Sequence, residues 1–459
     1  MSNISNITNP MDTSNVTSIL NALSKNIVST KHNLKLNDMC KCNYIYTLNS
    51  YRNSLIQDSK PHNIDLSIID DFILNLIKTD YSPDVLSRIK YIESIPLVEQ
   101  KTPEWFKLRE GMISASDAGY FLKKSGASKA VDSLKIKVGL KKYCNSSAPP
   151  LMHGNTYEDV SRAIYESRNS VSVTEYGILS SPTVCIGASP DGIVTHCHKD
   201  TYECMSKYGR LLEIKNPYSR EIDMTIKPEY LVQILQQQYT TQLPICDFVE
   251  TTIVDKFCHT FTSKPYENLE EMISDKLDKT TLTWQNRVKN HNIPIDNLNK
   301  FGNEKGLLLW YRKQFSETDI RHKYILYPLT SLYETQIIEK WTVDTNSHYF
   351  KEGYSYVCTK YWRLDVYSEK TVVYDQKTFE GDYVPQLCAV WDVITKCNEM
   401  QKKGEDVAKY IEEIENTKGS PFYNENKRKK KISIDDDDGH SGGKNSKTYN
   451  PHKSIELDF

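Results

Sequence analysis

The chain has 459 residues, and its 58 lysines and arginines stand against 60 aspartates and glutamates, a formal net charge of -2. This length suits about three domains, or one large domain with additions, and it can bury a core without disulfides. The balanced charge excludes a uniformly basic coating protein and an acidic disordered one, but it leaves local charge open. The 11 cysteines are odd in number and irregularly spaced, which is typical of a reducing, intracellular compartment.

The N-terminal part of the chain carries no targeting or chemical motif. Residues 1–15 lack the basic start and apolar stretch of a signal peptide, and we expect them to be disordered. No run of 18 apolar residues predicts a membrane span. Residues 16–98 are expected to form a helical region, because apolar spacing predicts helices over 64–78 and 81–97.

The pattern changes over residues 99–260. A helix is predicted over 115–124 and a polar helix over 228–242. Segments bounded by Gly, Pro and Ser predict the strands VSVTEYGIL, TVCIGAS, DGIVTH, RLLEIK and DFVETTIV. Helices and strands in this order predict an α/β fold with a central mixed β-sheet flanked by helices.

The rest of the chain divides into two predicted parts. Residues 261–401 are expected to be an α+β extension of the core. Its predicted helices span 265–290 and 332–341, and its predicted strands span 322–328, 361–367 and 370–375. Residues 402–459 are predicted to be a charged, largely disordered tail with a KRKKK and a DDDD run. The KRKKK run fits a nuclear-targeting or DNA-tethering segment and, equally, a plain charged tail.

Two carboxylates are expected to meet on neighbouring strands. Glu213 and Lys215 alternate with apolar residues in RLLEIK, so they share one face of the strand. Asp191 lies in a Ser-Pro-Asp-Gly bend before DGIVTH, and pairing of DGIVTH with RLLEIK would bring Asp191 to Glu213. Carboxylates held together repel each other unless a cation lies between them, and oxygen ligands suit Mg²⁺ or Mn²⁺. Taken singly, these motifs are equally explained by a surface ion pair and an ordinary turn.

Further polar residues accompany these motifs along the chain. Glu158 lies beside the apolar face of a predicted helix and could add a third carboxylate. Gln233 and Gln237 are one helical turn apart, and a glutamine amide can orient a water or a phosphate oxygen. Taken alone, Glu158 would be a solvated helix residue, and the glutamines would reflect compositional bias.

The ordered set resembles the PD-(D/E)XK nuclease superfamily. More closely, it resembles the YqaJ-type viral recombinase, or lambda-exonuclease-like, family. The resemblance starts at Trp105-Phe-Lys-Leu-Arg109 and Ser114-Ala-Ser116. It continues through Gly154 and Glu158, Ala188-Ser-Pro-Asp-Gly192 and Leu212-Glu-Ile-Lys-Asn-Pro217 to Gln233, and covers about residues 100–255. Asn216 replaces a frequent cysteine of the family, and the segment between Asp191 and Glu213 is longer than usual.

The resemblance implies a Mg²⁺-dependent site, with Mn²⁺ as an alternative. Asp191 and Glu213 would be metal ligands together with the Ile214 carbonyl. Glu158 would serve a second metal position or hold a metal-bound water. Two metals can stabilise both the attacking and the leaving oxygen of an in-line displacement at phosphorus.

The resemblance also implies roles for five uncharged or basic residues. Lys215 would orient the attacking water and help to deprotonate it, and Gln233 would position that water or the phosphate. Arg109, Ser116 and Ser189 would line a pocket for a 5′-phosphate, since a guanidinium binds phosphate bidentately and hydroxyls add neutral donors.

Several neighbouring features have structural explanations. Ser114 and Asp117 form a capping-box pattern, so we expect Ser114 to cap the helix 115–124 and Ser116 to bind phosphate. Trp105 is expected to be core. The cluster His196, Cys197, His198 and Cys204 invites a zinc site, but its spacing matches no standard ligand set and favours a hairpin elaboration.

The charge distribution supports a nucleic-acid face. Residues 101–150 hold ten Lys and Arg against four acids, a net charge of +6, whose contacts with phosphates would be independent of sequence. For any single lysine, a solvated helix surface is the alternative.

The sequence therefore predicts a metal-dependent DNA exonuclease, acting 5′→3′ on double-stranded DNA ends and leaving 3′ single strands for viral recombination or genome processing. Alternatives are an endonuclease or RNA-degrading nuclease with the same core, and an inactive DNA-binding virion component. The family includes trimers and suggests a single-strand annealing protein as partner. A viral protein of this kind would lie in the host cytoplasm or nucleus, or in the virion.

Overall fold

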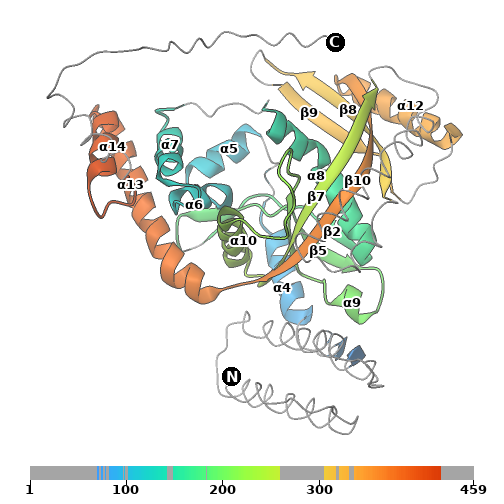
Figure 1. Ribbon diagram of the computed structural model, residues 1–459, viewed down its shortest axis with the longest axis horizontal. Helices are drawn as coiled ribbons and strands as arrows, with labels where there is room; N and C mark the ends of the chain where they lie inside the picture. Colours follow the sequence, from blue (N-terminus) through green and yellow to red (C-terminus); the bar gives the residue numbers. More distant parts are fainter. Residues whose placement is uncertain are drawn as a thin grey trace, which may run out of the picture.

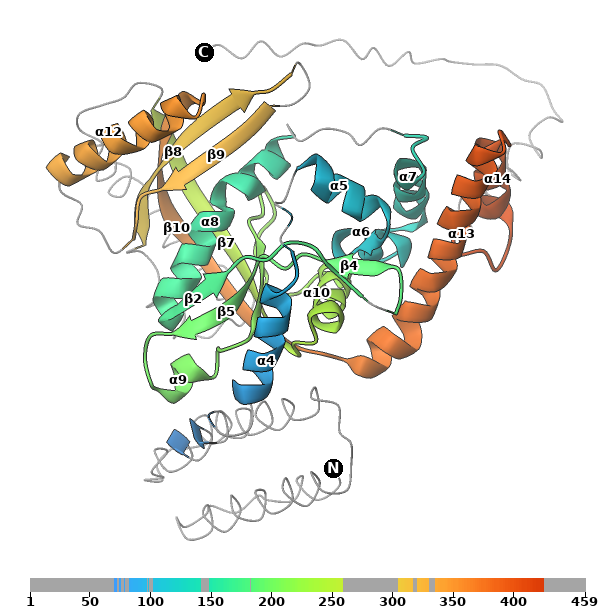
Figure 2. The same cartoon turned by 180° about the vertical axis from the view of Figure 1, so that it is seen from behind.

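The computed structural model describes residues 82–96, 102–141, 148–258 without 182, 304–316, 320–329 and 335–424, with a few positions between 70 and 98. Figures 1 and 2 show a long twisted sheet with helices on both faces and a second group of helices beside it. The predicted α/β fold with a central mixed sheet is confirmed. The predicted helices over 64–78 and 265–290 and the KRKKK and DDDD runs lie outside the described residues, wholly or for the most part.

The central sheet has seven strands in the order β2-β5-β6-β7-β10-β8-β9. They are β2 (Val171–Thr174), β5 (Gly192–Cys197), β6 (Leu211–Lys215), β7 (Ile245–Cys258), β8 (Lys305–Gln314), β9 (Ile320–Leu326) and β10 (Ser355–Val373). Only β6 and β7 are paired in parallel among these neighbours, so the sheet is mixed. The predicted pairing of DGIVTH with RLLEIK is present, because Gly192 lies opposite Leu212 in an antiparallel register.

Different helices cover the two faces of the sheet. On one face, α8 (Pro149–Asn169) packs through Tyr165 against Leu212 and Val249. On the other face, α4 (Ser82–Glu93) and α10 (Pro228–Thr241) pack against Leu211 and Phe248. Because side chains alternate along a strand, β6 and β7 present Glu213 and Lys215 on the α10 face and Leu212 and Asp247 on the α8 face.

A small sheet and a helical layer lie beside the α10 face. The small sheet has the order β1-β4-β3, made of β1 (Ile113–Ser114), β4 (Ile186–Ala188) and β3 (Leu179–Ser180). The helical layer consists of α5 (Pro103–Glu110), α6 (Ala115–Phe121), α7 (Ala127–Lys137), the π-helix η3 (Lys377–Tyr383), α13 (Val384–Lys402) and α14 (Val407–Asn416). Two further helices, α9 (Tyr202–Met205) and α12 (Thr335–Lys351), lie near the two ends of the central sheet (Figure 1).

Helix α14 differs from the disordered tail predicted from residue 402. Val407, Ile411 and Ile414 are spaced along one face of α14 and are buried in the same cluster as α13. Asp406 caps the helix by accepting a hydrogen bond from the Lys409 amide at 3.0 Å. The high charge of this segment lies on the exposed face, which is why composition alone suggested disorder.

Three predicted strands have different limits in the structure. The segment VSVTEYGIL is divided between β2 and β3, which belong to different sheets. The predicted strands 361–367 and 370–375 are one strand, β10, with an irregular register between Leu364 and Val366. Strand β8 was not predicted, although its residues Leu307, Leu308 and Leu309 are buried.

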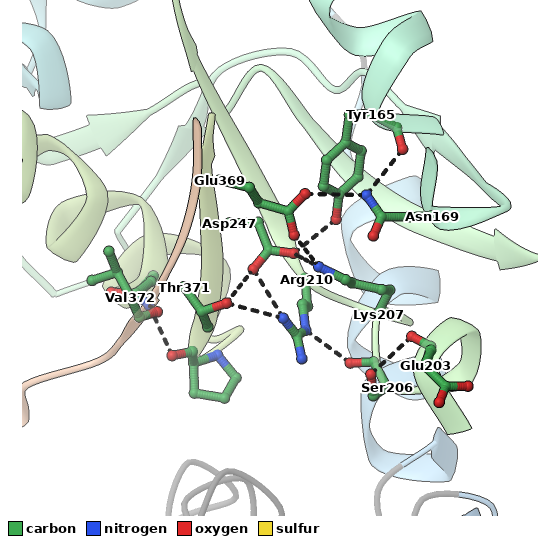
Figure 3. A network of polar contacts seen from close by, with 12 residues as sticks. Tyr165, Asn169, Glu203, Ser206, Lys207, Arg210, Asp247, Glu369, Thr371 and Val372 are labelled. Atoms are coloured by element: carbon green, nitrogen blue, oxygen red, sulfur yellow. Dashed lines mark hydrogen bonds and ion pairs between the residues drawn. The ribbon is translucent and has the colours of Figure 1, made fainter. Parts of the chain in front are cut away.

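A buried polar network joins the strands to α8 (Figure 3). Asp247 of β7 accepts hydrogen bonds from Arg210 Nη1 at 2.9 Å, Lys207 Nζ at 2.8 Å and Tyr165 OH at 2.9 Å. Lys207 also pairs with Glu369 of β10. Burial would raise the pKa of Asp247, but the charges of Arg210 and Lys207 hold it well below its ordinary value.

Candidate active site

Asp191 is fixed at the end of the β5–β6 pair. Its amide donates to the Leu212 carbonyl at 3.1 Å, and its carboxylate oxygen Oδ2 accepts a hydrogen bond from the Ile214 amide at 2.7 Å. The next residue, Gly192, lets β2 pack closely on the other side of β5, because a Cβ on Gly192 would lie 2.1 Å from Val173 Cγ1. Asp191 is therefore held against the backbone segment that carries Glu213 and Lys215.

Glu213 is fully buried on the same face of β6 as Lys215. One carboxylate oxygen of Glu213 accepts from Lys215 Nζ, and the other accepts from Gln237 Nε2 at 2.6 Å. Lys215 Nζ also lies 5.2 Å from the centre of the Tyr230 ring, so its ammonium group is held between a carboxylate and an aromatic face.

The pKa directions reflect the charges around Asp191 and Lys215. Burial raises the pKa of Asp191 well above its ordinary value, and the charges of Glu213 and Glu158 raise it further. Burial alone would lower the pKa of Lys215, but the charges of Glu213 and Asp191 more than offset this effect and raise it. The charges of Glu213 and Glu158 thus act on Asp191 at close range, and Lys215 lies among them.

This donor set fits a divalent cation by charge and by ligand type, because Mg²⁺ and Mn²⁺ prefer carboxylate and carbonyl oxygens. Within the described residues, no three or more His, Cys, Asp and Glu side chains are already gathered as a ligand set. Asp191 is turned to the Ile214 amide, and Glu213 to Lys215 and Gln237. The carboxylates would therefore exchange these internal partners for a cation on binding it.

Gln237, not Gln233, makes the described contact with Glu213. Both glutamines lie on α10, but Gln237 is fully buried and Gln233 is half-buried. The amide of Gln237 donates to Glu213, whereas no contact of Gln233 with the acidic residues is described. Gln233 lies one helical turn before Gln237 on α10.

The neighbours of Gln237 connect α10 to the surrounding strands. Gln236 Nε2 donates to the carbonyls of Ile113 and Gly187, each at 2.9 Å. Gln238 Nε2 donates to the Pro244 and Val372 carbonyls at 2.8 and 2.9 Å. Three consecutive buried glutamines thus attach one helix to the small sheet, to Glu213 and to the end of β10.

Arg109 and Ser116 are brought together as the sequence predicts. Arg109 Nη2 donates to Ser114 Oγ at 2.8 Å and to Ser116 Oγ at 3.0 Å, and its guanidinium lies 4.5 Å from the centre of the Trp105 ring. Trp105 is buried, as predicted. The cluster therefore presents a guanidinium with two hydroxyl groups, a combination that suits phosphate oxygens.

Ser114 does not act as the predicted side-chain cap. It occupies the N-cap position of α6, but its hydroxyl makes no capping hydrogen bond to the helix backbone. Instead, Ser114 Oγ donates to the Asp117 carboxylate at 2.6 Å. Helix α6 also ends at Phe121, before the predicted residue 124.

Ser189 lies close by in the chain path but is directed elsewhere. Strands β1 and β4 are parallel, with Ser114 opposite Gly187, so Ser116 and Ser189 both follow the ends of paired strands. Ser189 Oγ donates to the Tyr176 carbonyl at 3.4 Å. The described contacts thus join Arg109 to Ser116, but none of them joins either residue to Ser189.

Part of the basic segment 101–150 is used inside the fold. Lys137 Nζ donates to the Met112 carbonyl at 2.5 Å and to the Arg109 carbonyl, which supports the end of α5. Lys123 donates to the Tyr423 carbonyl, and Lys141 pairs with Asp132 at 3.0 Å. The charge available to a nucleic acid is therefore smaller than the count suggests.

The cluster invoked for zinc is engaged in hairpin contacts. Cys197 Sγ donates to the Cys204 carbonyl at 3.2 Å, and Cys204 Sγ donates to the Ser170 carbonyl at 3.0 Å. The rings of His196 and His198 lie 4.8 Å apart, and His198 Nε2 is 2.9 Å from Ser172 Oγ.

Along the described stretches, no helix has the length and apolarity required to cross a membrane.

Comparison with known proteins places these residues in a family. Residues 104–244 match the YqaJ-like viral recombinase domain. The uncharacterized protein R354 of Acanthamoeba polyphaga mimivirus is 28% identical over 363 residues, which are 73% of this chain and 60% of that protein. The chain thus spans 60% of the length of this curated relative.

Two solved structures of an alkaline exonuclease from Laribacter hongkongensis, one of them in complex with dAMP, are also similar. They are 28% and 29% identical, with a TM-score of 0.27, and cover 33% of this chain and 74% of theirs. All the predicted site residues lie inside the matched range 104–244. Over residues 104–244, this chain therefore resembles the YqaJ-like viral recombinase domain.

Proposed function

We propose that the protein is a metal-dependent nuclease that degrades double-stranded DNA from a 5′ end and leaves 3′ single strands. The observation that carries the proposal is that Asp191, Glu213 and Glu158 lie close enough to influence one another, with Lys215 paired to Glu213, inside the segment that matches the YqaJ-like domain. Carboxylates held this close repel one another unless a cation lies between them, so the cluster favours a bound cation.

Asp191 and Glu213, with the Ile214 carbonyl between them, would hold Mg²⁺ or Mn²⁺, and Glu158 would support a second position or a bound water. When bound, such a cation supplies Lewis-acid stabilisation of negative oxygen at phosphorus. Gln237 would keep the Glu213 carboxylate in place through its hydrogen bond of 2.6 Å. The half-buried Gln233 would lie toward the water or the phosphate.

Lys215 would act beside the reacting phosphate. Because its pKa is raised, Lys215 is an ammonium group in this arrangement, which can donate hydrogen bonds to the attacking water and to phosphate oxygens. Hydrolysis forms a bond from the water oxygen to phosphorus and breaks the bond to the leaving oxygen. The water proton leaves to solvent or a nearby base, and the positive charge of Lys215 favours the negative transition state.

The cluster of Arg109 and Ser116 would bind a terminal 5′-phosphate, with Ser189 as a third donor. The Arg109 guanidinium already uses one nitrogen for Ser114 and Ser116, and a phosphate would replace or share these hydroxyl contacts. A pocket for a terminal phosphate favours digestion from ends and would distinguish an exonuclease from an endonuclease with the same chemistry.

The test compares linear duplex DNA, with and without a 5′-phosphate, with closed circular DNA and RNA, in Mg²⁺ or Mn²⁺. We expect digestion of linear DNA, loss of digestion in Asp191→Asn and loss of the 5′-phosphate preference in Arg109→Ala. Lys107→Ala, an exposed basic residue of the same helix, is the matched control. Cutting of closed circles would contradict the exonuclease, and absence of cleavage in every metal would contradict any nuclease.

A further inference from the structure

Aromatic rings and cations continue from the catalytic strand to the far end of the central sheet. Tyr218 follows Lys215 by three residues and is 57% exposed. Its ring lies 5.5 Å from the ring of His153, which lies 4.8 Å from that of Tyr157. These residues lie near the N-terminal end of α8, so the series starts beside the proposed active site.

Lys360 of β10 joins this group to the extension of the sheet. Its Nζ lies 5.5 Å from the centre of the Tyr157 ring and 5.8 Å from the Trp310 ring of β8. Asp255 is the acidic residue at this point, because it pairs with Lys360 at 3.1 Å and accepts from Tyr157 OH. One cation therefore lies against rings from two different elements.

Strands β8 and β9 carry the series further. Trp310 lies opposite Tyr324 and Arg312 opposite His322 in their antiparallel register. Trp310 Nε1 donates to His322 Nδ1 at 3.0 Å, which fixes both rings. The ring centres of Trp310 and His322 lie 5.5 Å apart, and Arg312 is exposed. The ring-and-cation surface consists of Tyr218, His153, Lys360, Trp310, His322 and Arg312.

The opposite face of the same strands is closed. Leu307 and Tyr361 are buried there against Ile338 of α12, with Trp341 packed beside them. Figure 2 shows α12 on the far side of β8 and β9 from α8. In contrast, the residues of the ring-and-cation surface beyond α8 remain half-buried or exposed. His153 Nε2 is buried and has no hydrogen-bond partner, so the surface also holds an unused polar atom.

We propose that the ring-and-cation surface binds unpaired nucleotides of a nucleic-acid strand next to the active site. The inference rests on the proposed nuclease function for its kind of substrate, and it assigns a role to β8, β9 and β10, outside the YqaJ-like domain. Flat rings accept unpaired bases by stacking without regard to sequence, and the exposed Arg312 supplies charge for a phosphate. A duplex keeps its bases stacked inside and would contact such rings only by its edges.

The test measures binding of a fluorescent single-stranded 20-mer of thymidine and of a 20-base-pair duplex in EDTA, where metal-dependent cleavage does not occur. Tyr218→Ala and Trp310→Ala should each weaken single-strand binding about 5- to 100-fold, as expected for loss of one stacked base. Tyr218→Phe retains the ring and should bind as the unaltered protein does. Arg312→Gln should reduce the slope of log Kd against log salt concentration by about one unit, as expected for the loss of one phosphate contact.

Phe350→Ala is the matched control, because Phe350 is 51% exposed on α12, away from this surface. Thermal unfolding of every variant shows whether a loss of binding comes from a loss of stability. Because Tyr218 is exposed, Tyr218→Ala should leave the fold intact even if Trp310→Ala does not. Unchanged single-strand binding in both Tyr218→Ala and Trp310→Ala would overturn the inference, as would an equal loss in Phe350→Ala or a loss confined to duplex.

Cleavage is scored separately on linear duplex DNA with Mg²⁺ or Mn²⁺. Ring-dependent single-strand binding in a protein that cleaves nothing would reject the nuclease and retain the binding surface. Cleavage by a protein whose ring variants bind single strands normally would reject the binding surface and retain the nuclease.

Discussion

Strands β6 and β7 carry a cluster of acids on each face, and the two clusters differ in the number of cations that accompany the acids. On the α8 face, the carboxylates of Asp247 and Glu369 meet the two cations Lys207 and Arg210 (Figure 3). On the α10 face, Glu213 pairs with Lys215, and the charges of Glu213 and of Glu158 from α8 act on Asp191 at the end of the sheet. The same two strands thus carry one network with two carboxylates and two cations, and one site in which neighbouring acids raise the pKa of a carboxyl group.

The pKa directions follow this difference. Arg210 and Lys207 hold the pKa of Asp247 well below its ordinary value although Asp247 is buried. Burial and the charges of Glu213 and Glu158 raise the pKa of Asp191. Buried carboxylates that are paired with protein cations therefore join elements of the fold, whereas we expect the acids crowded around Asp191 to favour a bound cation.

The largest expected effect is a loss of DNA cleavage when the cluster around Asp191 is altered. Asp191→Asn should reduce DNA cleavage by about 1,000-fold or more, because a catalytic metal contributes several kcal/mol and each 1.36 kcal/mol is a factor of about ten. Initial rates on linear duplex DNA check this. Retention of a tenth of the rate would mean that Asp191 holds no essential cation.

The free energy of unfolding should depend on Asp247 and not on Asp191, the reverse of the expectation for activity. Asp247→Asn leaves Arg210 and Lys207 with an uncompensated charge, so the free energy of unfolding should fall by about 3–5 kcal/mol. Asp191→Asn removes one of several repelling carboxylates and should leave the metal-free protein equally or more stable. Urea unfolding in EDTA compares the two, and equal destabilisation would remove the proposed difference in charge balance.

A divalent cation should stabilise one cluster and leave the other unaffected. At a hundredfold excess of Mg²⁺ or Mn²⁺ over its Kd, the protein should gain about 2.7 kcal/mol. Thermal unfolding at constant ionic strength measures this gain, with Asp191→Asn as the variant that should lose it. A gain of the same size in both proteins would point to another binding site.

Gln237 and Gln233 provide a finer comparison within the acidic cluster. Removal of the hydrogen bond to Glu213 by Gln237→Ala should lower activity or metal affinity by about 10- to 100-fold, as for other groups that orient a metal ligand. Gln233→Ala should have a smaller effect on metal affinity. Unfolding temperatures measured at increasing Mn²⁺ concentration give the metal affinity of each variant. If only Gln233→Ala lowers this affinity, the assignment of Gln237 is wrong.

Mild acidification should give the smallest change. Because the pKa of Asp247 is lower in the folded protein, its contribution to stability is complete above the unfolded-state value of about 3.9 and is lost as the pH falls through the folded-state value. The difference in stability between the unaltered protein and Asp247→Asn should therefore narrow below about pH 4. Unfolding temperatures at pH 7, 5, 4 and 3 measure it, and a constant difference would contradict the pairing.

Sequence patterns predicted the residues of the site that are close along the chain. Asp191, Glu213 and Lys215 lie on two successive strands, so period-two alternation and one hairpin pairing bring them together. Arg109 and Ser116 likewise meet across a single turn between α5 and α6. Local geometry is enough for both groups.

Long-range packing decided the features that the sequence did not predict. The choice between Gln237 and Gln233 depends on how α10 docks, since both lie one turn apart on the same helix. Asp247 lies in the predicted strand DFVETTIV, and its partners come from segments far apart in the chain. A charged residue inside a buried strand was the one signal for this network.

The amino-acid sequence by itself determined that this chain carries a set of carboxylates and one lysine on neighbouring strands of an α/β domain. Only the tertiary structure decided which carboxylates are neutralised and which are not. The physical reason is that a buried carboxylate takes its charge state from whichever cations surround it. For Asp247 these cations are Lys207 and Arg210, whereas the charges described around Asp191 are those of Glu213, Glu158 and Lys215.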